Sequence, residues 1–129
     1  MKTKKALLID VVNKTVTNVT VKRYQEIYDH IGNGCHLFCI PYTFENEDSL
    51  YADDEALLQD TIIGGFMLPD WHSPIIGNAI ILGSDDEGES VDCKTKAATI
   101  LEDIIFLDRN LANEYAALVM GRKPEIIIL

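Results

Sequence analysis

The sequence predicts an α+β fold in which a mainly antiparallel sheet carries helices packed on one face, as one domain over residues 1–129. Two observations lead to this prediction. The order of the predicted elements is β-β-α-β-β-α-β-β-α-α-β, in which hairpins dominate. The chain has 129 residues, of which 47% are apolar and 25% charged, so one hydrophobic core is expected.

Runs rich in β-branched residues and bounded by turn residues predict the strands. The first two are joined by a turn at Asn13-Lys14 and form a hairpin, and Pro41 marks the edge or the end of the third. A later run is interrupted at Gly77-Asn78, and the glycine-broken segment 61–69 fits either a strand or a loop. Strands are expected over residues 5–12, 15–21, 35–44, 49–52, 75–82, 89–91 and 125–129.

Apolar residues at helical spacing predict the helices. Thr20 is the expected N-cap of a helix over 23–31 that ends at Gly32, and the acidic run 53–55 opens a short helix through Leu58. The longest helix is predicted over 93–110 with Asp92 as its cap. Its apolar stripe is wide enough for burial on more than one side. A helix over 111–120 follows, and Gly121 ends it.

Charge is distributed unevenly along the chain, whose formal net charge is −10. Residues 1–23 hold six Lys or Arg and one acid, residues 24–92 hold fifteen acids and no Lys or Arg, and residues 93–129 hold five of each. Surfaces normally mix both signs, so the middle segment suggests an acidic face that docks a basic partner. The alternative is a solvating surface with its acids spread over the fold. Direct binding to nucleic acid or to anionic lipid is disfavoured.

Two acidic clusters and one tryptophan are the predicted partner-binding residues. The only Trp of the chain, Trp71, stands in a loop between two apolar segments and would be the apolar anchor, although such a residue can also fold back as a plug. The acidic candidates are Asp53, Asp54 and Glu55 in one turn, and Asp85, Asp86, Glu87 and Glu89 in another.

No catalytic residue, metal or cofactor is predicted. The segment Cys35-His36-x-x-Cys39 lacks the paired ligands of a zinc site, and the run 85–89 lacks the spacing of a calcium loop. Cys35 and Cys39 are expected on one face of a strand, too far apart to pair. The first turn of the long helix would lower the pKa of Cys93. A small enzyme that depends on Cys93 or on a His-Asp pair is therefore the least favoured alternative.

Three cysteines, an odd number, do not form a disulfide framework, and a reducing cytoplasm is the expected compartment. The apolar run 6–12 contains Asp10 and predicts a strand rather than a signal peptide. No stretch approaches the roughly 20 apolar residues of a membrane helix.

Three segments together resemble a family of small proteins of unknown function from bacteriophages and other mobile elements. They are Lys5-Ala6-Leu7-Leu8-Ile9-Asp10, then Leu50-Tyr51-Ala52-Asp53-Asp54-Glu55-Ala56-Leu57, and Ile76-Gly77-Asn78-Ala79-Ile80-Ile81-Leu82-Gly83 with the acidic turn at 85–88. The similarity covers residues 5–107, and the Trp71 loop and the apolar C-terminus depart from it. The resemblance implies a small acidic accessory protein acting in a bacterial cytoplasm, where such proteins often antagonise host machinery that binds nucleic acid.

The leading hypothesis is therefore a non-enzymatic accessory protein that binds a basic surface of a host protein, for example one that handles nucleic acid. It would act as a nucleic-acid mimic or as an inhibitor of host defence. The alternative is a protein that binds a small molecule or a nucleotide signal, with its pocket supplied by the basic residues between Lys2 and Arg23. The apolar tail Glu125–Leu129 is expected to pair inside the sheet or across a homo-oligomer.

Overall fold

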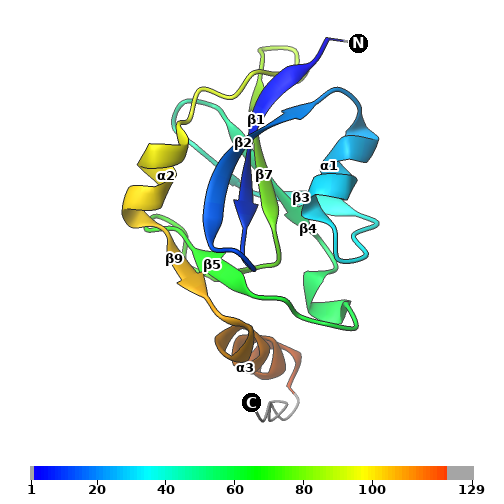
Figure 1. The fold of residues 1–129 in the computed structure, drawn as a ribbon, viewed down its shortest axis with the longest axis vertical. Helices are drawn as coiled ribbons and strands as arrows, with labels where there is room; N and C mark the ends of the chain where they lie inside the picture. The colour runs from blue at the N-terminus through cyan, green and yellow to red at the C-terminus, as the bar shows by residue number, and fades with distance from the viewer. Residues whose placement is uncertain (1, 122–129) are drawn as a thin grey trace.

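Two antiparallel sheets and four short helical segments make up residues 2–121, the part of the chain that the computed structural model describes (Figure 1). The strands are β1 (Lys4–Asp10), β2 (Thr15–Val21), β3 (Phe38–Thr43), β4 (Ser49–Asp53), β5 (Gly65–Met67), β6 (Ile75–Ile76), β7 (Ala79–Ser84), β8 (Ser90–Val91) and β9 (Ile105–Leu107). The helices are α1 (Tyr24–Ile31), α2 (Ala97–Asp103) and α3 (Arg109–Met120), with a 3₁₀ turn, η1 (Ala56–Leu58). The predicted α+β class with a mainly antiparallel sheet is confirmed.

The large sheet has the strand order β2-β1-β7-β4-β3, with β8 paired to the end of β7, and the small sheet has the order β6-β5-β9. The predicted hairpin is confirmed, because β1 pairs with β2 over its whole length, from Lys4 opposite Val21 to Asp10 opposite Thr15. The edge strand β3 contains Pro41, where its pairing with β4 shifts register. That position fits proline, which cannot donate to a ladder.

The predicted strand over 75–82 is divided between the two sheets. Its first part is β6 of the small sheet and its second part is β7 at the centre of the large one. Gly77 takes a positive φ of 86° at the junction, a conformation that favours glycine. Asn78 fixes the junction, because its side chain accepts a hydrogen bond from the Val11 N–H at 2.8 Å and donates one to the Ile31 carbonyl at 3.3 Å.

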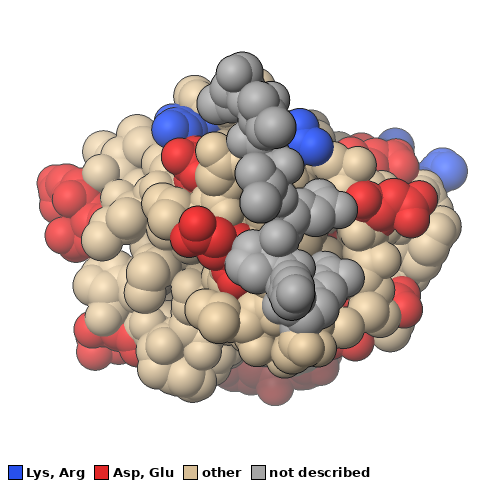
Figure 2. All heavy atoms as spheres, turned by 90° about the horizontal axis from the view of Figure 1, so that it is seen from below, with Lys and Arg blue, Asp and Glu red and all other residues tan. Residues whose placement is uncertain are grey.

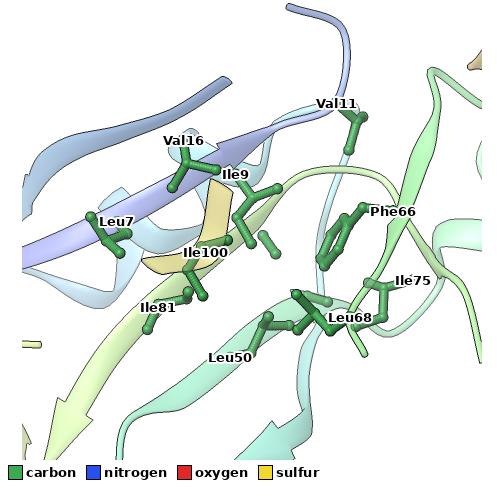
Figure 3. Close-up of a cluster of buried hydrophobic side chains, with 12 residues drawn as sticks. Leu7, Ile9, Val11, Val16, Leu50, Phe66, Leu68, Ile75, Ile81 and Ile100 are labelled. Atoms are coloured by element: carbon green, nitrogen blue, oxygen red, sulfur yellow. The ribbon is translucent and has the colours of Figure 1, made fainter. Parts of the chain in front are cut away.

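Helices lie on both faces of the large sheet, whereas the sequence predicted them on one. Alternate residues of β1 and β7 enter two separate cores. One core receives Leu7 and Ile81 together with Ile100 of α2 and Phe66 of β5 (Figure 3). The other core receives Ala6, Ile80 and Leu82 together with Ile27 and Ile31 of α1. Helices are needed on both faces because both pleat faces of β1 and β7 are apolar, and each must be covered.

The predicted helix over 93–110 is wrong in its extent. Asp92 is not its cap: the Asp92 side chain accepts a hydrogen bond from the Lys5 N–H at 2.8 Å, and the chain stays extended up to Lys96, the N-cap of α2. After Asp103 the chain forms β9, which pairs with β5. The β-prone residues Ile105–Leu107 fit the apolar spacing of a helix and also that of a strand. Their pairing with β5 in the folded chain makes them a strand.

The remaining helix ends show how local chemistry sets boundaries. Thr20 is not the predicted N-cap of α1, because it lies in β2, and Arg23 takes that position. Gly32 ends α1 as predicted, and Gly121 ends α3 in the left-handed conformation. The third strand begins only at Phe38, so Cys35 precedes it. The predicted strand over 125–129 lies outside the described residues.

None of the helices within residues 2–121 is both long and apolar enough to cross a membrane.

Candidate functional site

Trp71 is half-buried in the loop between β5 and β6, as the sequence predicted for its loop position. Its ring packs edge-on against Tyr42 of β3, with centroids 5.8 Å apart, and is tilted against the His72 ring, with centroids 4.4 Å apart. Tyr42 in turn contacts Phe44 at 4.7 Å. Trp71 therefore covers part of the core, as the plug interpretation expects, and keeps part of its surface exposed.

The exposed side of Trp71 lines a cleft of about 180 Å³, named here the Trp71 cleft. Two of the predicted acidic residues, Asp53 and Asp54, lie in the same cleft, and none of its described lining residues is Lys or Arg. The structure thus brings together the tryptophan and one of the two acidic clusters. The other lining residues are Cys39, Pro41, Ala52, Ala56, Leu57, Pro74, Ile75, Ile76 and Tyr115.

The two carboxylates of the cleft have different surroundings. Asp53 is buried, and its oxygens accept hydrogen bonds from the Glu55 N–H at 2.9 Å and from the Gln59 amide at 2.8 Å. Asp54 is exposed. Its backbone N–H donates to the Leu37 carbonyl at 2.8 Å, and its carboxylate lies beside the Cys39 thiol. Asp54 is therefore the carboxylate that can pair with an incoming cation, whereas Asp53 orders the turn that holds it.

The thiols are held in their neutral form. Burial, followed by the charge of Asp54, raises the pKa of Cys39 to about 11. Burial, followed by Asp53, raises the pKa of Cys35 to about 11. The predicted lowering of the Cys93 pKa is wrong, because Cys93 lies in the extended segment before α2 and burial, with Asp48, raises its pKa. A neutral thiol is a poor nucleophile, so these surroundings count against the thiol enzyme.

The second acidic cluster, residues 85–89, lies at the opposite end of the large sheet. Ala52 pairs with Ala79, so Asp53 is level with the start of β7, and Asp85 follows the end of that strand. At about 3.3 Å per residue the two clusters are roughly 20 Å apart. The two clusters therefore do not share one site.

Three of the N-terminal basic residues lie beside the second cluster. Glu89 shares a small cavity with Lys4, Lys22 and Arg23, so this end of the sheet mixes both signs. The cavity has a volume of about 20 Å³, which is room for one water molecule. A larger surface depression of about 570 Å³ is lined by Lys5, Asn18, Val19 and Thr20. Figure 2 shows the face seen from below, where acidic side chains are scattered among uncharged ones and do not form one continuous patch.

A second and larger cleft lies beside Tyr42 and has a volume of about 590 Å³. It is named here the Tyr42 cleft, and sequence reasoning missed it. One available signal was that Lys94 and Lys96, two of its lining residues, are the first basic residues after the base-free segment 24–92. Its lining is formed by Tyr42, Phe44, Glu45, Asn46, Leu68, Pro69, Asp70, Lys94, Thr95, Lys96, Thr99, Ile100 and Asp103.

Within residues 2–121, no three His, Cys, Asp or Glu side chains come close enough together to hold a metal ion. Comparison of the chain with protein-family models, with curated proteins and with solved structures finds no match.

Proposed function

We propose that this chain is a non-enzymatic binding protein that docks on a basic surface of a partner protein and receives an Arg or Lys side chain of that partner in the Trp71 cleft. The observation that carries the proposal is the presence of Trp71 and the exposed carboxylate of Asp54 in one cleft that no described Lys or Arg lines. An aromatic face and a carboxylate together are the usual surroundings of a bound guanidinium group.

The electrostatics of the whole chain support the same partner class. A net charge of −10 attracts basic proteins over a long range and raises the rate of encounter. In this proposal Glu55 lies near the contact, whereas Asp85, Asp86, Glu87 and Glu89, at the far end of the sheet, act through long-range attraction alone. A protein bound at that basic surface would compete with nucleic acid for it, which fits a host partner that handles nucleic acid.

The setting of a phage or mobile-element protein in a bacterial cytoplasm is part of the proposal. It is supported by the resemblance of residues 5–107 to small proteins of bacteriophages and mobile elements, and by the acidic composition of the chain.

The first experiment is capture of partners from a bacterial lysate with the tagged protein at 50 and 400 mM NaCl. We expect a basic protein to be enriched at low salt and lost at high salt. Asp54→Asn combined with Trp71→Phe should reduce its capture at least tenfold at low salt. The matched control Asp86→Asn, another exposed acid with a similar change in charge, should change capture less than twofold.

Direct binding of an arginine-rich peptide, followed by Trp71 emission, provides a measurement with defined components. Equal affinity of the wild type and the Asp54→Asn variant would contradict the placement of the cation in the Trp71 cleft. A larger loss with Asp86→Asn than with Asp54→Asn would move the docking site to the other end of the sheet.

A further inference from the structure

We propose that the Tyr42 cleft binds a short zwitterionic ligand, a peptide of about three residues with free termini and apolar side chains. This site is separate from the partner-binding cleft and does not depend on the function proposed above. The loop 68–74 divides the two, because Leu68 and Asp70 line the Tyr42 cleft and Trp71 and Pro74 line the other.

The size and the floor of the cleft suit a small organic ligand. Its volume of about 590 Å³ lies within the range of known ligand sites, roughly 300–1,000 Å³. Apolar side chains from three segments contribute to its lining: Tyr42 and Phe44 near β3, Leu68 after β5, and Ile100 of α2. Such a surface favours a ligand with an apolar or aromatic body.

Charges of opposite sign lie at the two ends of the cleft. Lys94 and Lys96 precede α2, and Asp103 is the last residue of that helix. At 1.5 Å per residue, Lys96 and Asp103 are about 10 Å apart along α2. Asp70 also lines the cleft. The acidic end of this helix is therefore marked by Asp103.

The lysine end is held by a buried carboxylate. Asp48 is fully buried, and one of its oxygens accepts hydrogen bonds from the backbone N–H groups of Lys94 at 2.9 Å and Thr95 at 2.7 Å, and from the Thr95 hydroxyl at 2.6 Å. The Lys94 ammonium also donates to the Asn46 carbonyl at 3.2 Å. Glu45 is adjacent to Asn46 in the chain and also lines the cleft. Its negative charge offsets one of the two lysines, so this end of the cleft has a net charge of +1.

The separation and the signs of these charges define the ligand. An extended chain spans about 3.3–3.6 Å per residue, so three residues reach about 10 Å. The ligand carboxylate would face Lys94 and Lys96, and its ammonium group would face Asp103. Polyanions such as nucleoside triphosphates are disfavoured, because the lining holds three carboxylates and two lysines.

The test is titration of the full chain with the tripeptide Phe-Ala-Leu in three forms: with free termini, N-acetylated, and C-amidated. Trp71 is the only tryptophan and contacts Tyr42 of the cleft, so its emission reports occupancy, and titration calorimetry provides a second readout. We expect the free peptide to bind at least tenfold more tightly than either capped form.

Two variants of exposed residues assign the ends. Lys96→Gln should abolish the preference for the free carboxyl terminus, and Asp103→Asn should abolish the preference for the free amino terminus. Asp86→Asn and Lys22→Gln are the matched controls and should change no affinity by more than twofold. Asp54→Asn should also leave peptide binding unchanged, which separates this site from the proposed partner site.

Equal affinity for free and capped peptides would overturn the zwitterion assignment. Absence of both an emission change and a heat of binding up to millimolar peptide would overturn the site itself.

Discussion

Asp48 connects the turn before β4 to the segment that leads into α2. Its three hydrogen bonds join groups that are 46 or 47 positions apart in the chain, and its second oxygen, Oδ1, is buried without a hydrogen-bond partner. A buried carboxylate of this kind is costly unless these bonds are made, so its removal should affect the whole domain.

We expect Asp48→Ala to lower the free energy of unfolding by ~3 kcal/mol, because three donors lose their buried acceptor at once. Asp48→Asn keeps one carbonyl oxygen and should lose about half as much. Urea unfolding followed by circular dichroism measures both variants. Asp86→Ala, at an exposed position, serves as the control, and an Asp48→Ala variant within ~0.5 kcal/mol of the wild type would contradict this role.

The thiol groups give a prediction with a defined pH dependence. Because burial raises the pKa of Cys35 and Cys39 from 9 to about 11, their thiolate fraction at pH 8 should be ~100-fold lower in the folded chain than after unfolding. Alkylation by iodoacetamide, measured peptide by peptide with and without urea, tests this. The folded state favours the protonated thiol, so the free energy of unfolding should fall as the pH rises from about 9 to about 11. Folded-state labelling within tenfold of the unfolded rate at pH 8 would contradict these pKa shifts.

Secondary-structure elements were predictable where local and tertiary preferences agree. The hairpin of β1 and β2 follows from β-branched residues on either side of a short turn, and it pairs over its full length. The segment Ile105–Leu107 was placed in a helix because its apolar spacing continues that of α2. Pairing with β5 decides its conformation, and no local pattern in the sequence records that pairing.

The N-cap of α3 gives a prediction at the scale of one element. The Asp108 side chain accepts a hydrogen bond from the Leu111 N–H at 2.9 Å. Asp108→Ala should lower the free energy of unfolding by ~1 kcal/mol, whereas Asp108→Ser should retain most of it. Thermal and urea unfolding measure the difference. Asn110→Ala, also in the first turn of α3, is the control, and a loss with Asn110→Ala as large as with Asp108→Ala would argue against a specific capping effect.

At the scale of the whole molecule, the candidate site depends on contacts that the sequence does not display. Trp71 and the acidic residues were recognisable by composition alone. Their positions in the fold could not be predicted from the sequence. Asp53 and Asp54 lie in one cleft with Trp71, whereas the 85–89 turn lies beside Lys4, Lys22 and Arg23. Only the register of β7 against β1 and β4 determines which charges become neighbours.

The overall charge leads to a last prediction. A chain of net charge −10 repels itself, and salt screens that repulsion. Raising NaCl from 20 to 300 mM shortens the Debye length from about 20 Å to about 6 Å and should raise the free energy of unfolding by ~1 kcal/mol. A variant with Asp54→Asn, Asp60→Asn and Asp86→Asn removes three exposed charges and should show a smaller response. A decrease in stability with salt would instead mean that attraction between opposite charges, such as Glu89 beside Lys4, outweighs the repulsion among the acids.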